Sequence, residues 1–393
     1  MKIDNFFGVQ FLVFCLVAAA FTTIYIPQPV LPVIQKEFNV NEAFASLTVS
    51  LVILGIALSN LPFGRIADTY PIKPIILLGG TIVTICGLFC AVTSSLTIMI
   101  VTRFIQGLFL PSLTTCLSVY LAQNMPAERL NVVMGLYVSA TVTGGMFGRL
   151  LGGWIYPQQS WRSAFISASI FLFFSTIAVA ALLPQEKKSV VKENFGESFI
   201  SLICRLDLLR IYFVVFGSYF VFSSMFNYLP FYLAGPSFEM STDFIAIIYT
   251  TYITGIIISP FAGKLSNRIG NGNTMMIGTI IFALSIVITL IESTTVIVIS
   301  LIGACAGFFS IHAAAAGLLN CKIDSSRGRA NSLYVLFYYI GGSVGITLSG
   351  YAYLFFEWTG VVMLGLLMLL MPLVTGIIEN RRLKCKLTEE YLK

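Results

Sequence analysis

Residues 136–161 read LYVSATVTGGMFGRLLGGWIYPQQSW, and residues 333–358 read LYVLFYYIGGSVGITLSGYAYLFFEW. Both stretches open with Leu-Tyr-Val, carry a Gly-Gly pair and further glycines at the same spacings, and close on a tryptophan. Upstream, Pro62-Phe63 corresponds in the same way to Pro260-Phe261. Matches that keep their order over an offset of about two hundred residues indicate that one half of the chain duplicates the other.

The composition places both halves in a lipid bilayer. Hydrophobic residues make up 57% of the chain and charged residues 10%, against about 25% in soluble domains. Apolar windows of about 20 residues, the length that crosses a membrane as a helix, predict twelve transmembrane helices. They lie near residues 8–30, 44–64, 75–93, 96–120, 132–155, 161–184, 209–233, 242–263, 274–292, 294–319, 330–354 and 359–379. Duplicated halves of membrane helices are typical of a carrier.

The basic residues predict the orientation. If both termini are cytoplasmic, all but four of the 23 Lys and Arg residues fall on cytoplasmic segments. Lys36 and Arg162 then lie outside, while Arg103 and Arg149 lie within helices. The net charge of +6 therefore reflects topology and contact with anionic lipid, and we expect no nucleic-acid partner.

Neither the first apolar segment nor the cysteines indicate processing or metal binding. The first segment continues past a short hydrophobic run to Val30 and fits the repeat, so we expect it to be retained and not cleaved as a signal. The eight cysteines form no metal-ligand spacing and no disulfide framework. We predict free thiols, no metal site and no cofactor.

The predicted helices divide the chain into an N-terminal six-helix bundle, residues 1–184, and a C-terminal six-helix bundle, residues 209–380. Residues 185–208 break the apolar pattern and are predicted to join the bundles as a cytoplasmic linker. Within the linker region, the stretch from Phe199 to Leu209 has enough apolar spacing for a short helix on the membrane surface. Residues 381–393 form a basic cytoplasmic tail.

Two loop sequences occupy corresponding places in the halves. Gly64-Arg-Ile-Ala-Asp68 follows the second helix, and Gly263-Lys-Leu-Ser-Asn267-Arg268 follows its counterpart. Both resemble the cytoplasmic loop motif of the major facilitator superfamily, and the resemblance extends over essentially the whole chain. Thr69 and Asn267 depart from the family pattern, which has a basic residue and an aspartate there. The resemblance implies twelve helices in two bundles and gate or motif roles for Gly64, Asp68, Gly263 and Arg268.

Further motifs carry the same resemblance. Arg103-Phe-Ile-Gln106-Gly107 is similar to the family's Arg-x-x-Gln-Gly motif in the fourth helix. An arginine in hydrocarbon is costly, which favours a functional role, although it can simply bond to helix carbonyls and neighbouring polar groups. Between the fourth and fifth helices, Glu128-Arg129 resembles a cytoplasmic gate contact of the family, answered by Arg327 between the tenth and eleventh helices. A solvated ion pair is the alternative.

The fifth helix carries a strip of glycines. Gly144, Gly148 and Gly152 recur every four residues, so they form one face on which another helix can pack closely. Two sequences resemble the YnfM-type subgroup of bacterial inner-membrane efflux carriers: Gly148-Arg-Leu-Leu-Gly-Gly-Trp154 and Phe308-Phe-Ser-Ile-His312. This resemblance implies a multi-pass protein of the bacterial inner membrane.

Three ionisable side chains other than Tyr and Cys are predicted well inside the bilayer: Arg103, Arg149 and His312. His312 is the one histidine of the chain and the group best suited to carry a proton near neutral pH. We hypothesise that His312 exchanges a coupling proton and that Arg103 sets its protonation. The alternative is a neutral histidine bonded to its neighbours. Arg103 and Arg149 either point different ways or help to form a weakly anion-attracting cavity.

A central cavity between the bundles would suit a flat, partly apolar solute, because aromatic and hydrogen-bonding side chains fall near its expected walls. The cavity candidates are Tyr25, Gln28, Arg103, Gln106, Tyr137, Arg149, Phe226, Tyr338 and Tyr339.

The sequence therefore predicts a monomeric all-helical carrier that works by alternating access and exports a small organic compound, such as a drug, toxic metabolite or siderophore, in exchange for protons. Proton-coupled uptake of an organic anion or metabolite is the first alternative, favoured by the two buried arginines. A membrane-embedded transferase is the alternative from another class. One histidine without an intramembrane acid offers little for acid–base or metal chemistry, so we expect no enzyme.

Overall fold

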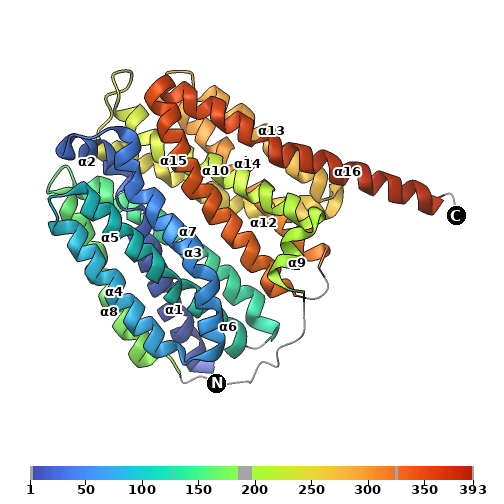
Figure 1. Cartoon of the computed structure of the whole chain (residues 1–393), viewed down its shortest axis with the longest axis horizontal. Helices are drawn as coiled ribbons and strands as arrows, with labels where there is room; N and C mark the ends of the chain where they lie inside the picture. The colour runs from blue at the N-terminus through green and yellow to red at the C-terminus, as the bar shows by residue number, and fades with distance from the viewer. Residues whose placement is uncertain (1–2, 126, 185–196, 324–325, 392–393) are drawn as a thin grey trace. The chain divides into compact units, whose positions relative to one another are not determined.

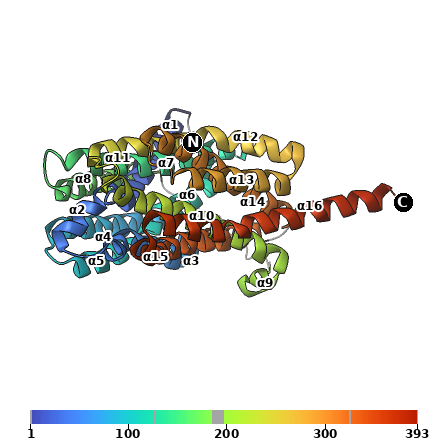
Figure 2. The same cartoon turned by 90° about the horizontal axis from the view of Figure 1, so that it is seen from above.

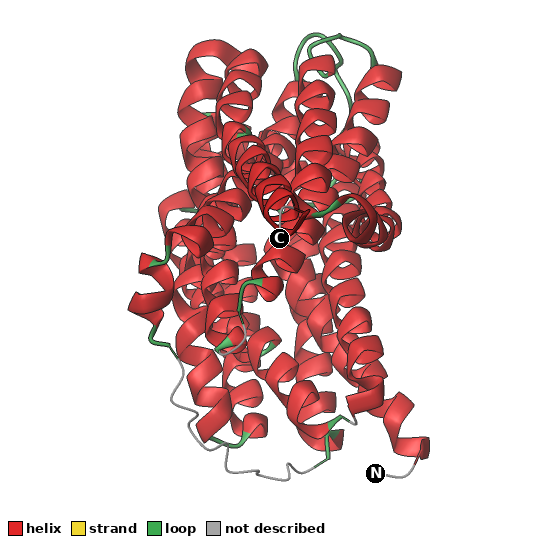
Figure 3. Cartoon of the chain, turned by 90° about the vertical axis from the view of Figure 1, so that its right-hand side faces the viewer, coloured by secondary structure: helices red, strands yellow, loops and turns green. Residues whose placement is uncertain are grey.

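The computed structural model describes residues 3–125, 127–184, 197–323 and 326–391. Over these residues the chain forms helices joined by short loops, and none of them is in a strand (Figure 3). The chain forms two compact units. Unit 1 comprises Met1–Asn194 and Glu239–Thr250, and unit 2 comprises Phe195–Phe238 and Thr251–Lys393.

Unit 1 contains the helices drawn from blue to green in Figure 1, together with a short helix from later in the chain. They are α1 (Ile3–Tyr25), η1 (Gln28–Val30), α2 (Leu31–Phe38), α3 (Glu42–Thr69), α4 (Ile72–Val92), α5 (Leu96–Phe109), η2 (Leu110–Ser112), α6 (Thr114–Asn124), α7 (Ala127–Ile155), α8 (Trp161–Leu182) and α11 (Thr242–Ile248). The main packing pairs are α1 with α7, α3 with α5, and α4 with α8.

Unit 2 contains the helices drawn from light green to red (Figure 2). They are α9 (Phe199–Cys204), α10 (Leu206–Ala234), α12 (Ile253–Ile269), α13 (Asn271–Ile288), α14 (Thr294–Cys321), α15 (Arg327–Met368) and α16 (Leu370–Tyr391). The short helix η3 (Tyr249–Tyr252) spans the junction between the units. The main packing pairs are α10 with α15, α13 with α14, α12 with α14, and α13 with α16.

Ten segments of the described chain are helical and apolar enough to cross a membrane by length and composition. The predicted helix 132–155 lies within α7, whose first residues have side chains outside the described part of the chain. The last two predicted helices lie in one helical run, Arg327–Arg381, which is broken inside at Glu357, where φ is 51° and ψ is −141°. The all-helical prediction is confirmed for the described residues, and the count of twelve stays a prediction.

The duplicated glycines have the same packing role in both units. A methyl group on Gly144 would lie 2.2 Å from the carbonyl oxygen of Ala18 in α1. One on Gly341 would lie 2.3 Å from the carbonyl oxygen of Phe216 in α10. Any side chain here would push the helices apart. The repeated glycines therefore correspond to the same kind of close helix contact in each unit. The same approach to a carbonyl oxygen recurs at Gly148, Gly152 and Gly345.

The tryptophans at the ends of the two repeated stretches donate hydrogen bonds to different kinds of acceptor. In unit 1, Trp161 Nε1 donates to Glu37 Oε2 of α2 at 2.5 Å. In unit 2, Trp358 Nε1 donates to Thr289 Oγ1 at 2.9 Å and stacks on the ring of Tyr232, with centroids 4.8 Å apart. The position of the tryptophan is repeated although its acceptor is not.

Candidate functional site

Arg103 lies fully buried in unit 1, on α5. Its Nε donates to the carbonyl oxygen of Thr48 at 2.9 Å, and its Nη1 donates to that of Thr23 at 2.7 Å. Its Nη2 donates to the carbonyl oxygen of Ile24 at 2.5 Å, and Nη1 also donates to Oε1 of Gln106. The guanidinium is therefore held by oxygen atoms from α1, α3 and its own helix.

Pro27 explains why α1 needs this donor. The helix ends at Tyr25, so the carbonyl groups of its last turn lack partners within the helix. The N–H that would bond the Thr23 oxygen belongs to position 27, where proline has none. A cation at the carboxyl end of a helix also interacts favourably with the helix dipole. Arg103 caps α1, which is the structural role that the sequence left open beside the functional one.

The other residues of this motif tie α5 to two more helices. Gln106 Nε2 donates to the carbonyl oxygen of Val83 in α4 at 3.0 Å. A methyl group on Gly107 would lie 2.2 Å from the carbonyl oxygen of Val52 in α3. Each position of Arg-x-x-Gln-Gly thus fixes one helix of unit 1. A proton-coupling role for Arg103 stays a prediction.

A second group of cavity candidates meets around Arg149, which is 2% exposed. Its Nε donates to Gln28 Oε1 at 2.7 Å, and its Nη1 donates to the carbonyl oxygen of Gly145 at 2.9 Å. Its Cζ lies 4.0 Å from the ring centroid of Tyr25 and 5.1 Å from that of Tyr249. The sequence proposed Tyr25, Gln28 and Arg149 for one cavity, and the structure brings them together; it adds Tyr249, which the sequence missed.

Tyr137 lies apart from this group. It stands twelve residues before Arg149 on α7, which is about 18 Å along a helix axis. Its hydroxyl donates to the carbonyl oxygen of Thr114 at 3.0 Å. Gln106 also lies elsewhere, beside Arg103.

His312 lies on α14 of unit 2 and pairs with Tyr334 of α15. Its Nδ1 is 3.0 Å from the Tyr334 hydroxyl oxygen, and that hydroxyl lies 3.2 Å from the carbonyl oxygen of His312. A phenol has one proton to donate. If that proton goes to the carbonyl oxygen, Nδ1 carries a proton and donates to the phenol, which leaves Nε2 as the basic nitrogen.

A continuous set of aromatic rings surrounds this pair. Tyr219 and Tyr338 stack with centroids 3.7 Å apart and planes at 11°. Phe222 and Phe308 stack at 4.0 Å and 17°. The His312 ring lies 6.1 Å from Phe308 and 5.5 Å from Tyr338, between centroids. We call this the aromatic cluster; it also contains Phe226, Tyr252, Phe309, Tyr334 and Tyr339.

The sequence found three members of the aromatic cluster, Phe226, Tyr338 and Tyr339, and missed most of the others. Helical spacing was the available signal. Tyr219, Phe222 and Phe226 stand three and four residues apart, so they share one face of α10. Phe308 and His312, and likewise Tyr334 and Tyr338, are four residues apart on their helices.

The gate candidates have the following contacts within their own units. Asp68 Oδ1 accepts a hydrogen bond from Gln123 Nε2 of α6 at 3.1 Å. Arg327 Nε donates within its own chain segment to the carbonyl oxygen of Ile323 at 3.0 Å, and Arg268 is exposed. No described atom lies within 4 Å of a methyl group placed on Gly64 or Gly263. The side chains of Glu128 and Arg129 lie outside the described residues.

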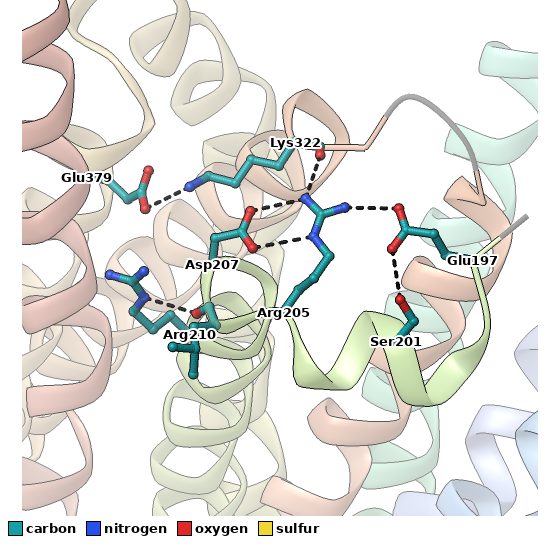
Figure 4. A network of polar contacts seen from close by, with 8 residues as sticks. Glu197, Ser201, Arg205, Asp207, Arg210, Lys322 and Glu379 are labelled. Carbon is teal, nitrogen blue, oxygen red and sulfur yellow. Dashed lines mark hydrogen bonds and ion pairs between the residues drawn. The ribbon is translucent and has the colours of Figure 1, made fainter.

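An ionic network gathers helix ends of unit 2 around Arg205 (Figure 4). Arg205 pairs with Glu197 at 3.1 Å and with Asp207 at 3.2 Å, and its Nη2 donates to the carbonyl oxygen of Lys322 at 3.3 Å. Lys322 in turn pairs with Glu379 of α16 at 2.8 Å. The hydrogen bond to Asp207 raises the pKa of the Arg205 guanidinium above its ordinary value, so the cation stays charged. The network fixes α9 against α10 and the end of α14.

Within the described ranges, no group of three or more His, Cys, Asp or Glu residues could hold a metal ion. The described side chains around Arg149 and in the aromatic cluster offer hydrogen bonds, aromatic rings and single charges.

Comparisons with known proteins agree over most of the chain. The profile described as Major Facilitator Superfamily matches residues 13–316 and 235–384. The chain is similar to the MFS-type transporter YybF of Bacillus subtilis, with 30% identity over 370 residues, 92% of this chain and 91% of that protein. It is similar to the inner membrane transport protein YnfM of Escherichia coli, with 28% identity over 387 residues, 96% and 92% of the two chains.

The chain is also similar to a relative of lower identity and to a solved structure. The chloramphenicol resistance protein CraA of Acinetobacter baumannii is 23% identical over 172 residues, 44% of this chain and 42% of that protein. A bacterial homologue of the human lysosomal transporter Spinster, solved in an inward-facing and unoccupied conformation, superposes with a TM-score of 0.77. The match covers 97% of this chain and 98% of that chain at 14% identity, so the likeness supports the fold.

Proposed function

Since this chain belongs to the Major Facilitator Superfamily, we propose that it is a secondary carrier that exports a small organic solute in exchange for protons. It is a multi-pass membrane transporter and not an enzyme. We place it in the bacterial inner membrane as a monomer with both termini in the cytoplasm, and the name of the Escherichia coli relative supports that membrane. In this proposal the solute site opens alternately to the two sides of the membrane.

The contact between His312 and Tyr334 carries the proton half of the proposal. Imidazole is the side chain whose charge changes most readily between about pH 5 and 8. Tyr334 occupies one ring nitrogen and the carbonyl group of the same residue, which orients the ring and directs proton exchange to Nε2. The aromatic cluster around the pair offers stacking surfaces at the position where a proton would be exchanged.

The solute half of the proposal follows from the same cluster and from Arg103. Stacked rings favour a flat, partly apolar compound. Arg103 already donates to four protein oxygens, which supports a neutral aromatic solute over an organic anion. The name of the relative CraA, chloramphenicol resistance protein, favours antibiotics among the compounds to test first.

Substrate-dependent proton flux tests the proposal. Purified protein is placed in liposomes that contain a pH-sensitive dye, and aromatic antibiotics, siderophores and organic acids are added one by one. We expect certain aromatic compounds to trigger proton movement with the wild type and with Ser300→Ala, a control on the same helix as His312. His312→Ala should abolish that movement. Full proton flux in His312→Ala, or solute equilibration without proton movement in the wild type, contradicts proton coupling through this residue.

A further inference from the structure

The short helix α11 packs within unit 1 although the chain before and after Glu239–Thr250 belongs to unit 2. Its partners are α7 and η1. Thr242 Oγ1 donates to the carbonyl oxygen of Gly153 at 3.3 Å. A methyl group on Gly153 would lie 2.4 Å from the Cβ of Ala246. The two helices therefore meet at a glycine, with no room for a side chain between them.

Arg149 stands at the end of this contact. Tyr249, which directly follows α11 and is fully buried, presents its ring to the guanidinium, and Tyr25 presents another ring at the shorter distance given above. Gln28 of η1 accepts the hydrogen bond from Nε. One cation on α7 thus contacts the end of α1, η1 and the segment that follows α11.

We propose that Arg149 is a positioning residue that latches α11 onto α7, and that this latch opens in each transport cycle. The chain enters and leaves α11 from unit 2, so any displacement of unit 2 pulls on α11 through Phe238 and Thr251. Lifting α11 separates Tyr249 from Arg149 and Thr242 from Gly153. The proposal rests on alternating access but on neither the solute nor the proton.

The chemistry of the latch separates arginine from its substitutes. A planar guanidinium can interact with two rings while it donates a directed hydrogen bond to Gln28. Lysine keeps the charge but presents a compact ammonium group, so Arg149→Lys should hold α11 less well. Arg149→Gln removes the cation. Tyr249→Leu removes one ring, whereas Tyr249→Phe keeps it and serves as the matched control.

Cysteine labelling measures how often α11 lifts. Ile245, fully buried on α11, is changed in Ile245→Cys, in a protein whose Cys15, Cys204, Cys321 and Cys385 are serines. Purified protein in detergent reacts with a soluble maleimide, and mass spectrometry follows position 245 and the buried native Cys90 separately. We expect Arg149→Gln and Tyr249→Leu to speed labelling at position 245 by about tenfold, with Arg149→Lys between these and the wild type. Tyr249→Phe should match the wild type, and Cys90 should stay protected throughout.

An unchanged rate at position 245 in Arg149→Gln overturns the latch. Equal acceleration at position 245 and Cys90 also overturns it, because the variant would then be loosening the whole of unit 1. Tyr249→Phe as fast as Tyr249→Leu would show that the ring is not what holds α11. None of these outcomes depends on which solute is carried, so a failed proton-flux experiment leaves the result intact.

Discussion

At the scale of single residues, we expect substitution of Arg103 to lower the stability of the fold. Lysine in Arg103→Lys keeps the charge but cannot reach the oxygens of Thr23, Ile24 and Thr48 together. We expect the free energy of unfolding to fall by about 2–4 kcal/mol, because each buried carbonyl left unpaired costs about 1–3 kcal/mol. Chemical unfolding in detergent measures the change. Arg268→Lys, at an exposed site, is the control, and equal stability of the two variants would rule out the cap.

Tyr334 allows a test of coupling that leaves His312 in place. Tyr334→Phe removes the hydroxyl that contacts Nδ1 and the carbonyl oxygen but keeps the ring in the aromatic cluster. We expect solute binding to persist while proton movement per solute falls at least about tenfold, which corresponds to about 1.4 kcal/mol. Dye-filled liposomes and solute-binding titrations measure the two quantities. The control is Tyr351→Phe, an exposed tyrosine on the same helix, and coupling that is equal in both variants would contradict the role of Tyr334.

Arg103, Arg149 and His312 can be recognised from the sequence because they are rare polar residues in an apolar chain. Their partners could not be recognised, because Arg103 bonds to backbone oxygens 55 and 80 positions away. Tyr219 and Phe222 were missed for a different reason. They are two of 17 tyrosines and 33 phenylalanines, so residue type alone carries little information about which ones gather.

At the scale of helices, the glycine contacts should tolerate no methyl group. Gly144→Ala and Gly341→Ala each place a carbon atom against a backbone oxygen, so the helices must shift. We expect each to lower the free energy of unfolding by about 1–3 kcal/mol, the usual cost of overpacking. No described atom lies within 4 Å of a methyl group on Gly135, which is on α7 like Gly144. Gly135→Ala should therefore be neutral or stabilising by up to about 1 kcal/mol; destabilisation equal to that of Gly144→Ala would contradict the packing argument.

The network around Arg205 should hold α9 without adding much stability. The Arg205 side chain is 33% exposed, so Arg205→Ala should cost under about 1 kcal/mol. Its local effect should be larger, because α9 loses its ionic contacts, and limited proteolysis between Glu197 and Leu206 should become faster. About 1 M salt should act in the same direction, since it shortens the screening length to about 3 Å. Arg210→Ala is the control, because Arg210 bonds to the carbonyl oxygen of Leu206 on its own helix. Equal rates of proteolysis in both variants would contradict the role of the Arg205 network in holding α9.

Helix positions could be predicted from hydropathy, whereas two breaks inside predicted helices were missed, although one of them contains a proline. The predicted helix 96–120 is interrupted at η2, which contains Pro111. The predicted helix 242–263 is interrupted at η3, whose sequence Tyr-Thr-Thr-Tyr has neither proline nor glycine. That break lies where the chain passes from unit 1 to unit 2. The division into units depends on contacts between residues far apart in the sequence, so the local sequence does not indicate it.

At the scale of the whole molecule, the duplication could be predicted and its exception could not. Each unit pairs its first long helix with the helix that carries the duplicated glycines, α1 with α7 and α10 with α15. Glu239–Thr250 departs from the repeat because its packing partners belong to the other half of the sequence. Sequence similarity shows which half of the chain a segment descends from. The unit in which the segment packs depends on the residues that it contacts.

Splitting the chain tests this exception. We expect fragments 1–190 and 191–393, expressed together, to co-purify, because the second fragment supplies α11 to unit 1. Arg149→Gln in the first fragment should lower the recovered complex several-fold if the cation–ring contacts contribute about 1 kcal/mol. Affinity capture through a tag on one fragment gives the yield, with Arg65→Gln as a control outside this contact. No co-purification would show that α11 does not hold to unit 1 without the covalent link.

The missing amide proton of Pro27 also constrains how this chain can diverge. If Arg103 is lost first, the Thr23 oxygen is left without a donor, and the descendant protein is impaired. If Pro27 is lost first, the new residue restores the amide donor, and the arginine becomes freer to drift. The two positions are therefore epistatic, and related lineages should be found to lose the proline before the arginine or both together.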